Sequence, residues 1–500
     1  MRMACTAQQS SLSFDRLNES DYPSLTGLSR EQFDDVCQHL SDKVKNTPVR
    51  SARTSIGLLL VKLYSGMSNK LLATIFGITK SSVRRAVSTV RQAFMRGFVP
   101  LYLGIEALTR DEIISQHTRP LAKSLFGAEN SLILVLDGTY IYINKSNNFA
   151  FQRRTYSLHK GRSLIKPMVI VTTTGHFVAI IGPYLADYKN NDAAILNHML
   201  RCNIDNFKDL LQEGDVFIVN RGFRDSLELL ADLGIQAEMP TLLSKGQKQM
   251  STEDANTSRL VTKIRWVVES ANARIKRFRY LDHVMPNSQI PYIGDFVRIV
   301  CALSNKYMPP LSSPASVEKD EAIAAKMLAQ CGKVNTLKQM VEEKKLPKRG
   351  KCWKQADEIS LEGFPRISEE QLRELTLGVY QLRLSSSYIQ EHLDGNCDLY
   401  FFAEDPSLLC VKMQSRHVSS RNYMLWIRYT NDNIDAWYCL CRAGARVVGM
   451  CSHVSAIIWY LAYKRYEDGS SVGVRNWGDH LADAAVFEID GDSTQSESEL

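Results

Sequence analysis

Residues 131–137 read SLILVLD and residues 215–220 read DVFIVN, and these two stretches decide the fold that the sequence predicts. Each is a short apolar run without helical periodicity, which is typical of a buried β-strand. The first run ends on Asp137 and the second on Asn220, so each strand brings a polar side chain to its end. If the sheet places these two strands side by side, Asp137 and Asn220 become neighbours.

The sequence around these runs predicts a mixed α/β sheet. Further strands are expected at residues 138–143, 166–174, 176–181 and 236–240, and helices at 192–202, 221–233 and 258–279. Strands that are followed by alternating strands and helices are typical of this fold class. The last helix is expected to bring Glu269 against the two strand ends. Its residues predicted to face the sheet are Trp266, Val267, Ala271 and Ile275, and those predicted on the substrate side are Arg265, Asn272, Lys276 and Arg279.

Residues 25–99 have a helical pattern, and residues 69–83 have the spacing of a helix-turn-helix. Gly77 supplies the positive φ of the tight turn, and Thr79 caps the second helix. The outer face of that helix then presents Lys80, Ser81, Arg84 and Arg85. A basic recognition helix predicts binding in the major groove of DNA, and the alternative is a plain helical hairpin.

Five segments in this order carry a family resemblance: LVLDGTYIYI, RRTYSLHKGRSLIKPMVIVTTTG, GPYLADYKNNDAAI, DVFIVNRGFRDS and RWVVESANARIKRF. The chain resembles the eukaryotic DDE-superfamily transposases, of the Harbinger-like and insertion-sequence-like kind, over about residues 25–307. The resemblance implies an RNase H-like catalytic core behind an all-α helix-turn-helix unit. It also implies metal-dependent cleavage and transfer of DNA strands, with three carboxylates that hold two Mg²⁺ or Mn²⁺ ions.

Carried over residue by residue, the resemblance makes Asp137 the first metal ligand and Glu269 the third. The second position, just before Arg-Gly-Phe, holds Asn220 where the family has an acid. Because hard divalent ions are held largely by carboxylates, we expect metal binding and catalysis to be impaired. Neither Asp215 in the same strand, nor Asp225, nor Asp192 in a separate loop is a convincing substitute. Three explanations stay open: a decayed or domesticated gene, an engineered knockout, and a metal site that tolerates asparagine.

Two further groups of basic residues are predicted to contact DNA phosphates. The first group lies in and before a predicted hairpin, and the second lies on the last helix of the core. Their members are Arg153, Arg154, His159, Lys160, Arg265 and Lys276. Asn190, Asn191 and Asp192 match a family loop, and the alternative is that they cap the following helix.

A Cys-x-Cys pair and a Cys-x-His pair, separated by nine residues, indicate a zinc site near the C-terminus. The four predicted Zn²⁺ ligands are Cys439, Cys441, Cys451 and His453, at a strand end and a helix start. This arrangement resembles the SWIM zinc finger, which implies a structural role in DNA or protein binding. The alternative is coincidence among eleven cysteines.

The length of the chain predicts about three or four domains, and a nuclear location is expected. The 500 residues carry a formal net charge of +7, without a signal peptide or an apolar run long enough for a bilayer. The basic run at 344–351 suits either a nuclear import signal or a solvated linker. The expected organisation is a disordered N-terminus at 1–23, a helix-turn-helix unit at 24–100, an RNase H-like DDE core at 125–308, a linker at 309–370, a β-rich segment with a small α+β zinc module at 371–465, and an acidic disordered tail at 485–500.

Three functions are compatible with the sequence. The first is a transposase-type protein that binds double-stranded DNA and cuts it, and the second is a domesticated, non-catalytic DNA-binding protein derived from one. The third, from another class, is a zinc-finger adaptor for protein interactions. The family resemblance implies a homodimer or larger assembly, and no membrane partner is expected.

Overall fold

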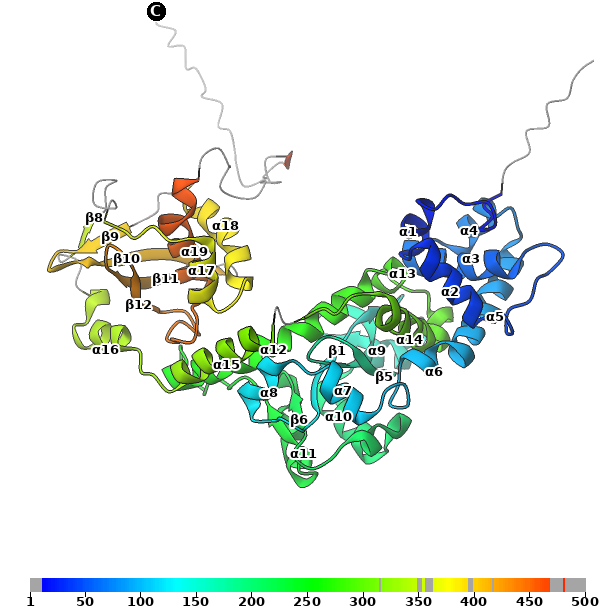
Figure 1. Cartoon of the computed structure of the whole chain (residues 1–500), viewed down its shortest axis with the longest axis horizontal. Coiled ribbons are helices and arrows are strands. Elements are labelled where there is room, and N and C mark those ends of the chain that lie inside the picture. Colours follow the sequence, from blue (N-terminus) through cyan, green and yellow to red (C-terminus); the bar gives the residue numbers. More distant parts are fainter. Residues whose placement is uncertain are drawn as a thin grey trace, which may run out of the picture. The chain divides into compact units, whose positions relative to one another are not determined.

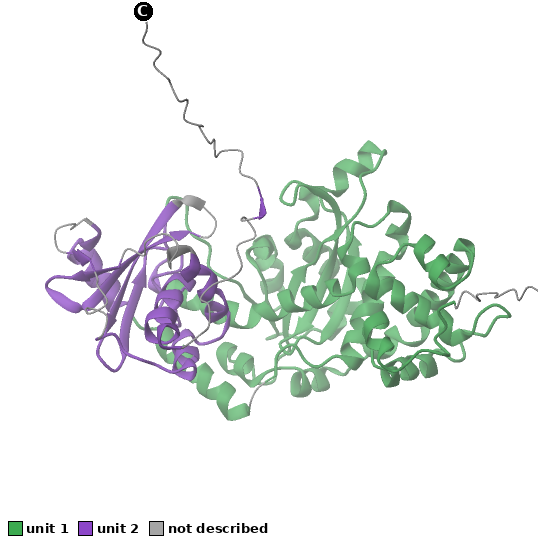
Figure 2. Ribbon diagram, turned by 90° about the horizontal axis from the view of Figure 1, so that it is seen from above, with its two compact units in different colours: residues 1–247, 253–333 green, residues 248–252, 334–500 purple. Residues whose placement is uncertain are grey.

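A computed structural model describes residues 11–313, 316–348, 353–355, 363–393, 399–415, 418–467 and 480–481. The chain forms two compact units, shown in Figure 2. Unit 1 contains residues 1–247 and 253–333, and unit 2 contains residues 248–252 and 334–500. The predicted acidic tail and residues 1–10 of the predicted disordered N-terminus lie outside the described residues, as does part of the basic run at 344–351.

Unit 1 begins with helices: α1 (Asp21–Thr26), α2 (Arg30–His39), α3 (Ala52–Ser65), α4 (Asn69–Ile75), α5 (Lys80–Gly97), α6 (Val99–Tyr102), α7 (Arg110–Gln116) and α8 (Pro120–Phe126) (Figure 1). Helices α4 and α5 are the pair predicted to form the helix-turn-helix. Gly77 between them has a φ of 62°, and the Thr79 hydroxyl accepts a hydrogen bond from the Ser82 N–H at 3.2 Å. The turn and the cap are therefore formed as the sequence predicts.

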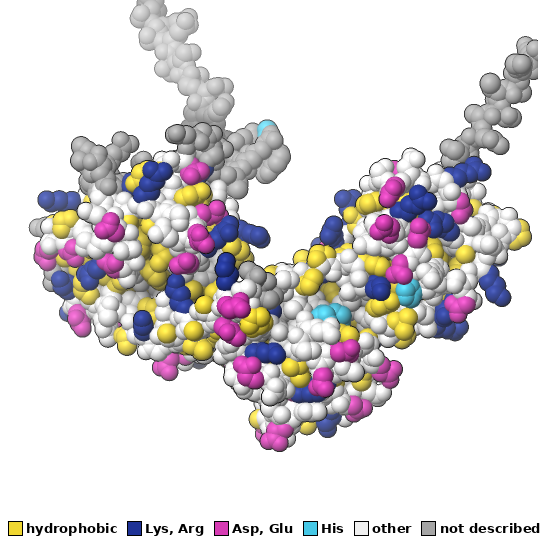
Figure 3. Space-filling view, viewed as in Figure 1, with side chains coloured by type: hydrophobic (Ala, Val, Ile, Leu, Met, Phe, Trp, Pro, Cys, Tyr) yellow, Lys and Arg dark blue, Asp and Glu magenta, His cyan; other side chains and the backbone are white. Residues whose placement is uncertain are grey.

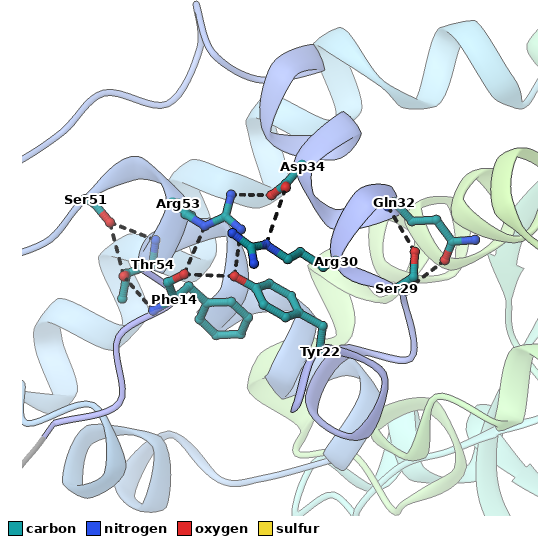
Figure 4. Close-up of polar contacts among 9 residues, drawn as sticks. All are labelled: Phe14, Tyr22, Ser29, Arg30, Gln32, Asp34, Ser51, Arg53 and Thr54. Carbon is teal, nitrogen blue, oxygen red and sulfur yellow. Dashed lines mark hydrogen bonds and ion pairs between the residues drawn. The ribbon is translucent and has the colours of Figure 1, made fainter. Parts of the chain in front are cut away.

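Residues 11–23 do not follow the expectation of disorder, because Phe14 is buried among the N-terminal helices. Its ring stacks on Phe33 with the centroids 4.9 Å apart. Its carbonyl accepts hydrogen bonds from Tyr22 Oη and Arg53 Nε, each at 2.9 Å, as Figure 4 shows. A Cβ on Gly57 of α3 would lie 2.2 Å from the Phe14 ring, so glycine is required there.

The rest of unit 1 is an α/β core. Its strands are β1 (Ile133–Gly138), β2 (Ile141–Tyr142), β3 (Tyr156–Ser157), β4 (Arg162–Thr172), β5 (Phe177–Tyr184), β6 (Val216–Ile218) and β7 (Gln236–Glu238). Its helices are α9 (Phe149–Thr155), η1 (Tyr188–Asn190), α10 (Asp192–Arg201), η2 (Ile204–Leu210), η3 (Arg221–Ser226), α11 (Leu227–Asp232), α12 (Thr252–Lys276), α13 (Arg279–Asp282), η4 (Asn287–Gln289), α14 (Ile290–Tyr307) and α15 (Val317–Cys331).

The core sheet is mixed, with strand order β2-β4-β1-β6-β7, and β3 and β5 also pair with β4. Strand β1 runs antiparallel to β4 and parallel to β6. Leu134 and Leu136 on one face of β1 share a hydrophobic core with Leu196 of α10. Ile133 and Val135, which alternate with them, are also fully buried, so protein covers both faces of the sheet.

Helix α12 begins at Thr252, six residues before the predicted start. Its buried side chains include Val261, Ile264, Val268, Ala271 and Ile275, at the three- and four-residue spacing of one helical stripe. The expectation that Trp266 faces the sheet is wrong, because its side chain is 40% exposed. Trp266 lies outside the buried stripe of α12, whereas its neighbours Val267 and Val268 are buried.

Unit 2 is an antiparallel sheet with helices. Its strands are β8 (Trp353–Gln355), β9 (Leu399–Phe402), β10 (Asp405–Ser415), β11 (Val418–Tyr429) and β12 (Ile434–Cys439), in the order β12-β11-β10-β9-β8. Its helices are α16 (Thr336–Glu343), η5 (Leu346–Lys348), α17 (Glu369–Thr376), α18 (Tyr380–Leu393), α19 (Ser452–Ala462) and η8 (Lys464–Tyr466). The predicted β-rich segment therefore begins with two helices, α17 and α18, before its strands.

Candidate functional site

The two strand ends that the sequence singled out meet at one edge of the core sheet. The parallel register of β1 and β6 pairs Val135 with Ile218, which brings Asp137 level with Asn220. The Asn220 Nδ2 donates a hydrogen bond to the Asp137 Oδ1 at 2.8 Å. Asn220 is also the N-cap of η3, where its Oδ1 accepts a hydrogen bond from the Gly222 N–H at 2.6 Å. The amide orientation is therefore fixed: its oxygen caps a helix and its nitrogen faces Asp137.

Asp192, which the sequence argument set aside, is a third polar group at this edge. A Cβ on Gly138 would lie 3.2 Å from the Asp192 Oδ1, and a Cβ on Gly222 would lie 2.8 Å from its Oδ2. The two glycines, which follow the Asp137 and Asn220 positions, thus leave room for this carboxylate. The Lys166 Nζ lies 2.9 Å from the Asp192 Oδ1 and also donates a hydrogen bond to the Asn190 carbonyl.

The sequence places Asp192 in a separate loop, and the structure brings it beside the strand ends, because distance along the chain is not distance in the fold. Asn191 caps α10 by accepting a hydrogen bond from the Ala194 N–H at 2.8 Å, as the capping alternative predicted. That cap places Asp192 in the first turn of α10, beside the strand ends. Gly138 and Gly222 are the sequence features that could have indicated room for a third side chain beside Asp137 and Asn220.

The pKa of the Asp137 carboxyl is raised to about 6, chiefly by burial and next by the negative charge of Asp192. The Arg265 guanidinium and the hydrogen bond from Asn220 act in the opposite direction. Asp137 is therefore a carboxyl group whose charge is costly in this structure.

Helix α12 reaches Asp137 through Asn272 instead of Glu269. The Asn272 Nδ2 donates a hydrogen bond to the Asp137 Oδ2 at 3.2 Å. The Glu269 side chain is 56% exposed and forms an ion pair with Arg265, one turn earlier. Its charge still acts on Asp137, where it raises the pKa slightly.

The basic residues predicted to contact DNA lie on several elements. Lys80, Ser81, Arg84 and Arg85 are exposed on α5, and Arg153, Arg154, His159 and Lys160 are exposed in α9 and in the turn between β3 and β4. The Lys160 Nζ lies 5.0 Å from the ring centroid of Tyr140, and the Lys276 Nζ lies 5.6 Å from that of Tyr142. Arg154 is paired with Asp187 at 3.0 Å.

Residues 136–305 match the family model of the DDE superfamily endonucleases. The matched segment begins one residue before Asp137 and contains Asn220 and Glu269, so it holds all three candidate positions. A DDE endonuclease domain implies an RNase H-like core, and the mixed sheet of unit 1 agrees with it. No curated protein and no solved structure was found to match the chain.

DDE endonuclease domains use divalent metals and act on DNA, but the side chains at these positions do not form their usual metal site. Asn220 contributes no charge and directs its nitrogen, which is not a metal ligand, at Asp137. Glu269 is paired with Arg265, and the nearby Asp192 is paired with Lys166. The three-carboxylate set that would hold two divalent ions is therefore incomplete.

A second candidate site lies in unit 2, where Cys439, Cys441, Cys451 and His453 converge. One ligand atom from each lies within 4.8 Å of the others, and all four residues are buried. The Cys439 Sγ lies 3.9 Å from the His453 Nδ1, while the buried His453 Nε2 has no hydrogen-bond partner in the described part of the chain. Three thiols and one imidazole in this geometry fit a tetrahedral Zn²⁺ ion.

A segment that precedes α12 closes over this Cys–His cluster. The Gln249 Nε2 donates hydrogen bonds to the carbonyls of Cys439 and Cys441, at 2.7 and 2.8 Å. The Gln249 Oε1 accepts a hydrogen bond from the Tyr438 hydroxyl at 2.9 Å. The sequence did not indicate this role, because Gln249 lies far from the cysteines along the chain.

Proposed function

We propose that this protein is a Harbinger-like, transposase-type DNA-binding protein in which strand cleavage is impaired by Asn220. The DDE endonuclease match supports a nucleic-acid substrate, and the basic outer face of α5 supports a helix-turn-helix that binds it. The observation that carries the impairment is the amide of Asn220, which donates to Asp137 where a family member would supply a second carboxylate. Because asparagine replaces this carboxylate, we expect the protein to bind DNA without cutting it efficiently.

The physical reason is charge. Two divalent ions in one site require anionic ligands, and the substitution removes one of three. With aspartate at position 220, its oxygen would face the Asp137 oxygen, and a bound cation would relieve the repulsion. With asparagine, the hydrogen bonds to Asp137 and from Gly222 hold the site together without a cation.

The test is the Asn220→Asp variant, assayed with Mg²⁺ or Mn²⁺ on supercoiled DNA. We expect nicking to rise by orders of magnitude above that of the unaltered protein, since metal placement is the catalytic device. Asn130→Asp adds the same charge before the opposite end of β1 and should leave nicking unchanged. Mn²⁺-dependent thermal stabilisation that appears only in Asn220→Asp would support the metal site without relying on activity.

Robust Mg²⁺-dependent nicking by the unaltered protein would overturn the proposed impairment. DNA binding is tested separately, by measuring the duplex affinity at several salt concentrations. A steep fall of affinity with salt is expected, because phosphate contacts release counterions. A protein-interaction adaptor would show no such dependence.

We also propose that Cys439, Cys441, Cys451 and His453 hold one structural Zn²⁺ ion in a SWIM-like module. The buried cluster and the His453 Nδ1, which lies 3.9 Å from the Cys439 Sγ, support it. Metal analysis of the pure protein should find one zinc per chain, and Cys451→Ser should abolish it. Cys202→Ser, an exposed cysteine outside the cluster, should keep the zinc.

Assembly and location complete the proposal. Transposition acts on two DNA ends, so a homodimer or larger assembly is proposed, and light scattering with and without DNA tests it. A nuclear location is proposed from the DNA substrate and the basic run at 344–351, and imaging of a fluorescent fusion tests it. Among the described residues, no helix is long and apolar enough to cross a bilayer.

A further inference from the structure

A basic cleft of about 860 Å³ lies in unit 1 between the N-terminal helices and the helices that follow α12. One wall comes from α3, α4 and α5, and the other from α13, η4 and α14. Six Lys or Arg side chains line it, namely Lys62, Lys70, Lys80, Arg84, Arg85 and Arg91. No Asp or Glu is among the described residues of its lining. The cleft is therefore a strongly positive concavity, which concentrates the field of its charges.

Helix α5 carries a charge pattern that is unfavourable for an isolated helix. Residues 80–97 contain no Asp or Glu, and Lys80 lies at the N-terminal end, where the helix dipole is positive. Lys80 and Arg84 are one turn apart, and like charges at this spacing repel. Among the described residues, neither Lys80 nor Arg84 has an acidic partner within ion-pair distance. An anion bound in the cleft would relieve this repulsion.

Two of the six lining cations, Arg91 and Lys62, contact residues of the opposite wall. Arg91 forms an ion pair with Asp295 of α14, and its guanidinium lies 4.4 Å from the ring centroid of Tyr292. On the α3 side, the buried Lys62 Nζ donates to the Asn69 Oδ1 at 2.9 Å and lies 4.2 Å from the ring centroid of Tyr280. The cleft is thus held open by contacts between the two walls of one unit.

The wall opposite α5 offers neutral hydrogen-bond donors. Ser288, Gln289 and Tyr292 line it from η4 and α14, together with His283 after α13. Hydroxyl and amide groups of this kind donate hydrogen bonds to phosphate oxygens, and such contacts do not depend on the DNA sequence. Figure 3 shows Lys and Arg side chains over the N-terminal helices, interspersed with Asp and Glu.

We propose that the basic cleft binds the phosphate backbone of one DNA strand, so that η4 and α14 contact the DNA together with helix α5. This inference rests on the proposed DNA-binding function. The cations of α5 that line the cleft and have no acidic partner among the described residues run from Lys80 to Arg85, which is about 8 Å at about 1.5 Å per residue. With about 3.4 Å of rise per nucleotide along a strand, that length spans about two phosphates, and Lys70 of α4 adds a further cation to the same wall. A single small anion would occupy only part of it.

The test places a negative charge on the wall formed by η4 and α14, which DNA would not contact if it bound only the outer face of α5. Ser288 is exposed, and Ser288→Glu should weaken duplex binding about tenfold or more and lower its salt dependence. Ser288→Lys should strengthen binding. The matched control is Ser24→Glu, because Ser24 is exposed on α1 and does not line the cleft. The DNA affinity of Ser24→Glu should stay within about twofold of that of the unaltered protein, because the added charge lies away from the cleft. Affinity is measured by fluorescence anisotropy on full-length protein, with folding checked by thermal melting.

Each outcome separates this inference from the proposed function. If the unaltered protein shows no salt-dependent DNA binding, the proposed function fails. A second outcome is that the unaltered protein binds DNA, that Arg84→Ala combined with Arg85→Ala weakens the binding, and that Ser288→Glu does not. In that case DNA uses only the outer face of α5, and the cleft inference is overturned. If pyrophosphate binds at micromolar concentration and is not displaced by duplex DNA, the cleft is a small-anion site, which also overturns it.

Discussion

At the scale of single residues, the carboxylates of the core divide into structural and functional ones by their partners. Asp215, which lies in the same run as Asn220, is fully buried and forms an ion pair with Arg110. Its oxygens also accept hydrogen bonds from the N–H groups of Leu132 and Gln212, at 2.9 and 2.8 Å. Every direction around this carboxylate is occupied, so it holds the start of β6 and is not available as a metal ligand.

Asp215→Asn should lower the free energy of unfolding by about 3 kcal/mol, because it removes the buried partner of the half-buried Arg110 and leaves that arginine without its counter-charge. Chemical denaturation monitored by fluorescence measures this. Asp232→Asn, at an exposed aspartate of α11, should change stability by less than about 0.5 kcal/mol. An equal effect of the two substitutions would show that the Arg110 pair is not structural.

At the scale of elements, a pair of histidine rings joins α7 to the start of β5. The His117 and His176 centroids are 4.2 Å apart. Burial lowers the pKa of His176 to about 3, with a contribution from His117, and burial also lowers the pKa of His117. Both rings are therefore held in the neutral form in the folded protein.

The sign of the pH dependence follows from these depressed pKa values. The unfolded chain binds protons near pH 6.5 and the folded chain does not, so stability is present above pH 6.5 and is lost as the pH falls. Between pH 7 and pH 5 we expect unit 1 to lose about 1–2 kcal/mol. His176→Gln should flatten this dependence, whereas His159→Gln, in the exposed turn after β3, should not. Thermal melts at matched ionic strength measure both.

The segment around Gln249 is the second element-scale prediction. Gln249→Ala removes three hydrogen bonds at the Cys–His cluster, so zinc should pass to a chelator several-fold faster. Gln247→Ala, two residues earlier at an exposed position, is the matched control and should release zinc at the original rate. Equal rates for the two variants would show that the segment does not support the metal.

At the scale of the whole molecule, the two units have separate cores. Cys439, Cys441 and Cys451 belong to the hydrophobic core of unit 2, together with Val454, Ile457 and Leu461 of α19. Metal removal should therefore lower the melting temperature of unit 2 by at least about 5 °C and leave that of unit 1 unchanged. Calorimetry of the unaltered protein and of Cys451→Ser, with and without chelator, resolves the two transitions. A single transition that shifts as one would contradict independent cores.

The sequence by itself determined the features that depend on neighbouring residues. Apolar runs placed β1 and β6, capping residues placed the starts of α5 and α10, and ligand spacing placed the Cys–His cluster at a strand end and a helix start. These features are local, because periodicity and capping act within a few residues. The juxtaposition of Asp137 and Asn220 was expected only on the condition that their strands are neighbours, and the pairing of β1 with β6 confirms that condition.

Only the tertiary structure decided which groups complete each site. Asp192 lies near Asp137 because the packing of α10 brings its first turn to two glycines. Glu269 is paired with Arg265, while Asn272 makes the contact to Asp137. Gln249 closes over cysteines that lie far along the chain. Sequence patterns do not encode these contacts, because they depend on how elements pack and which rotamer each side chain adopts once packed.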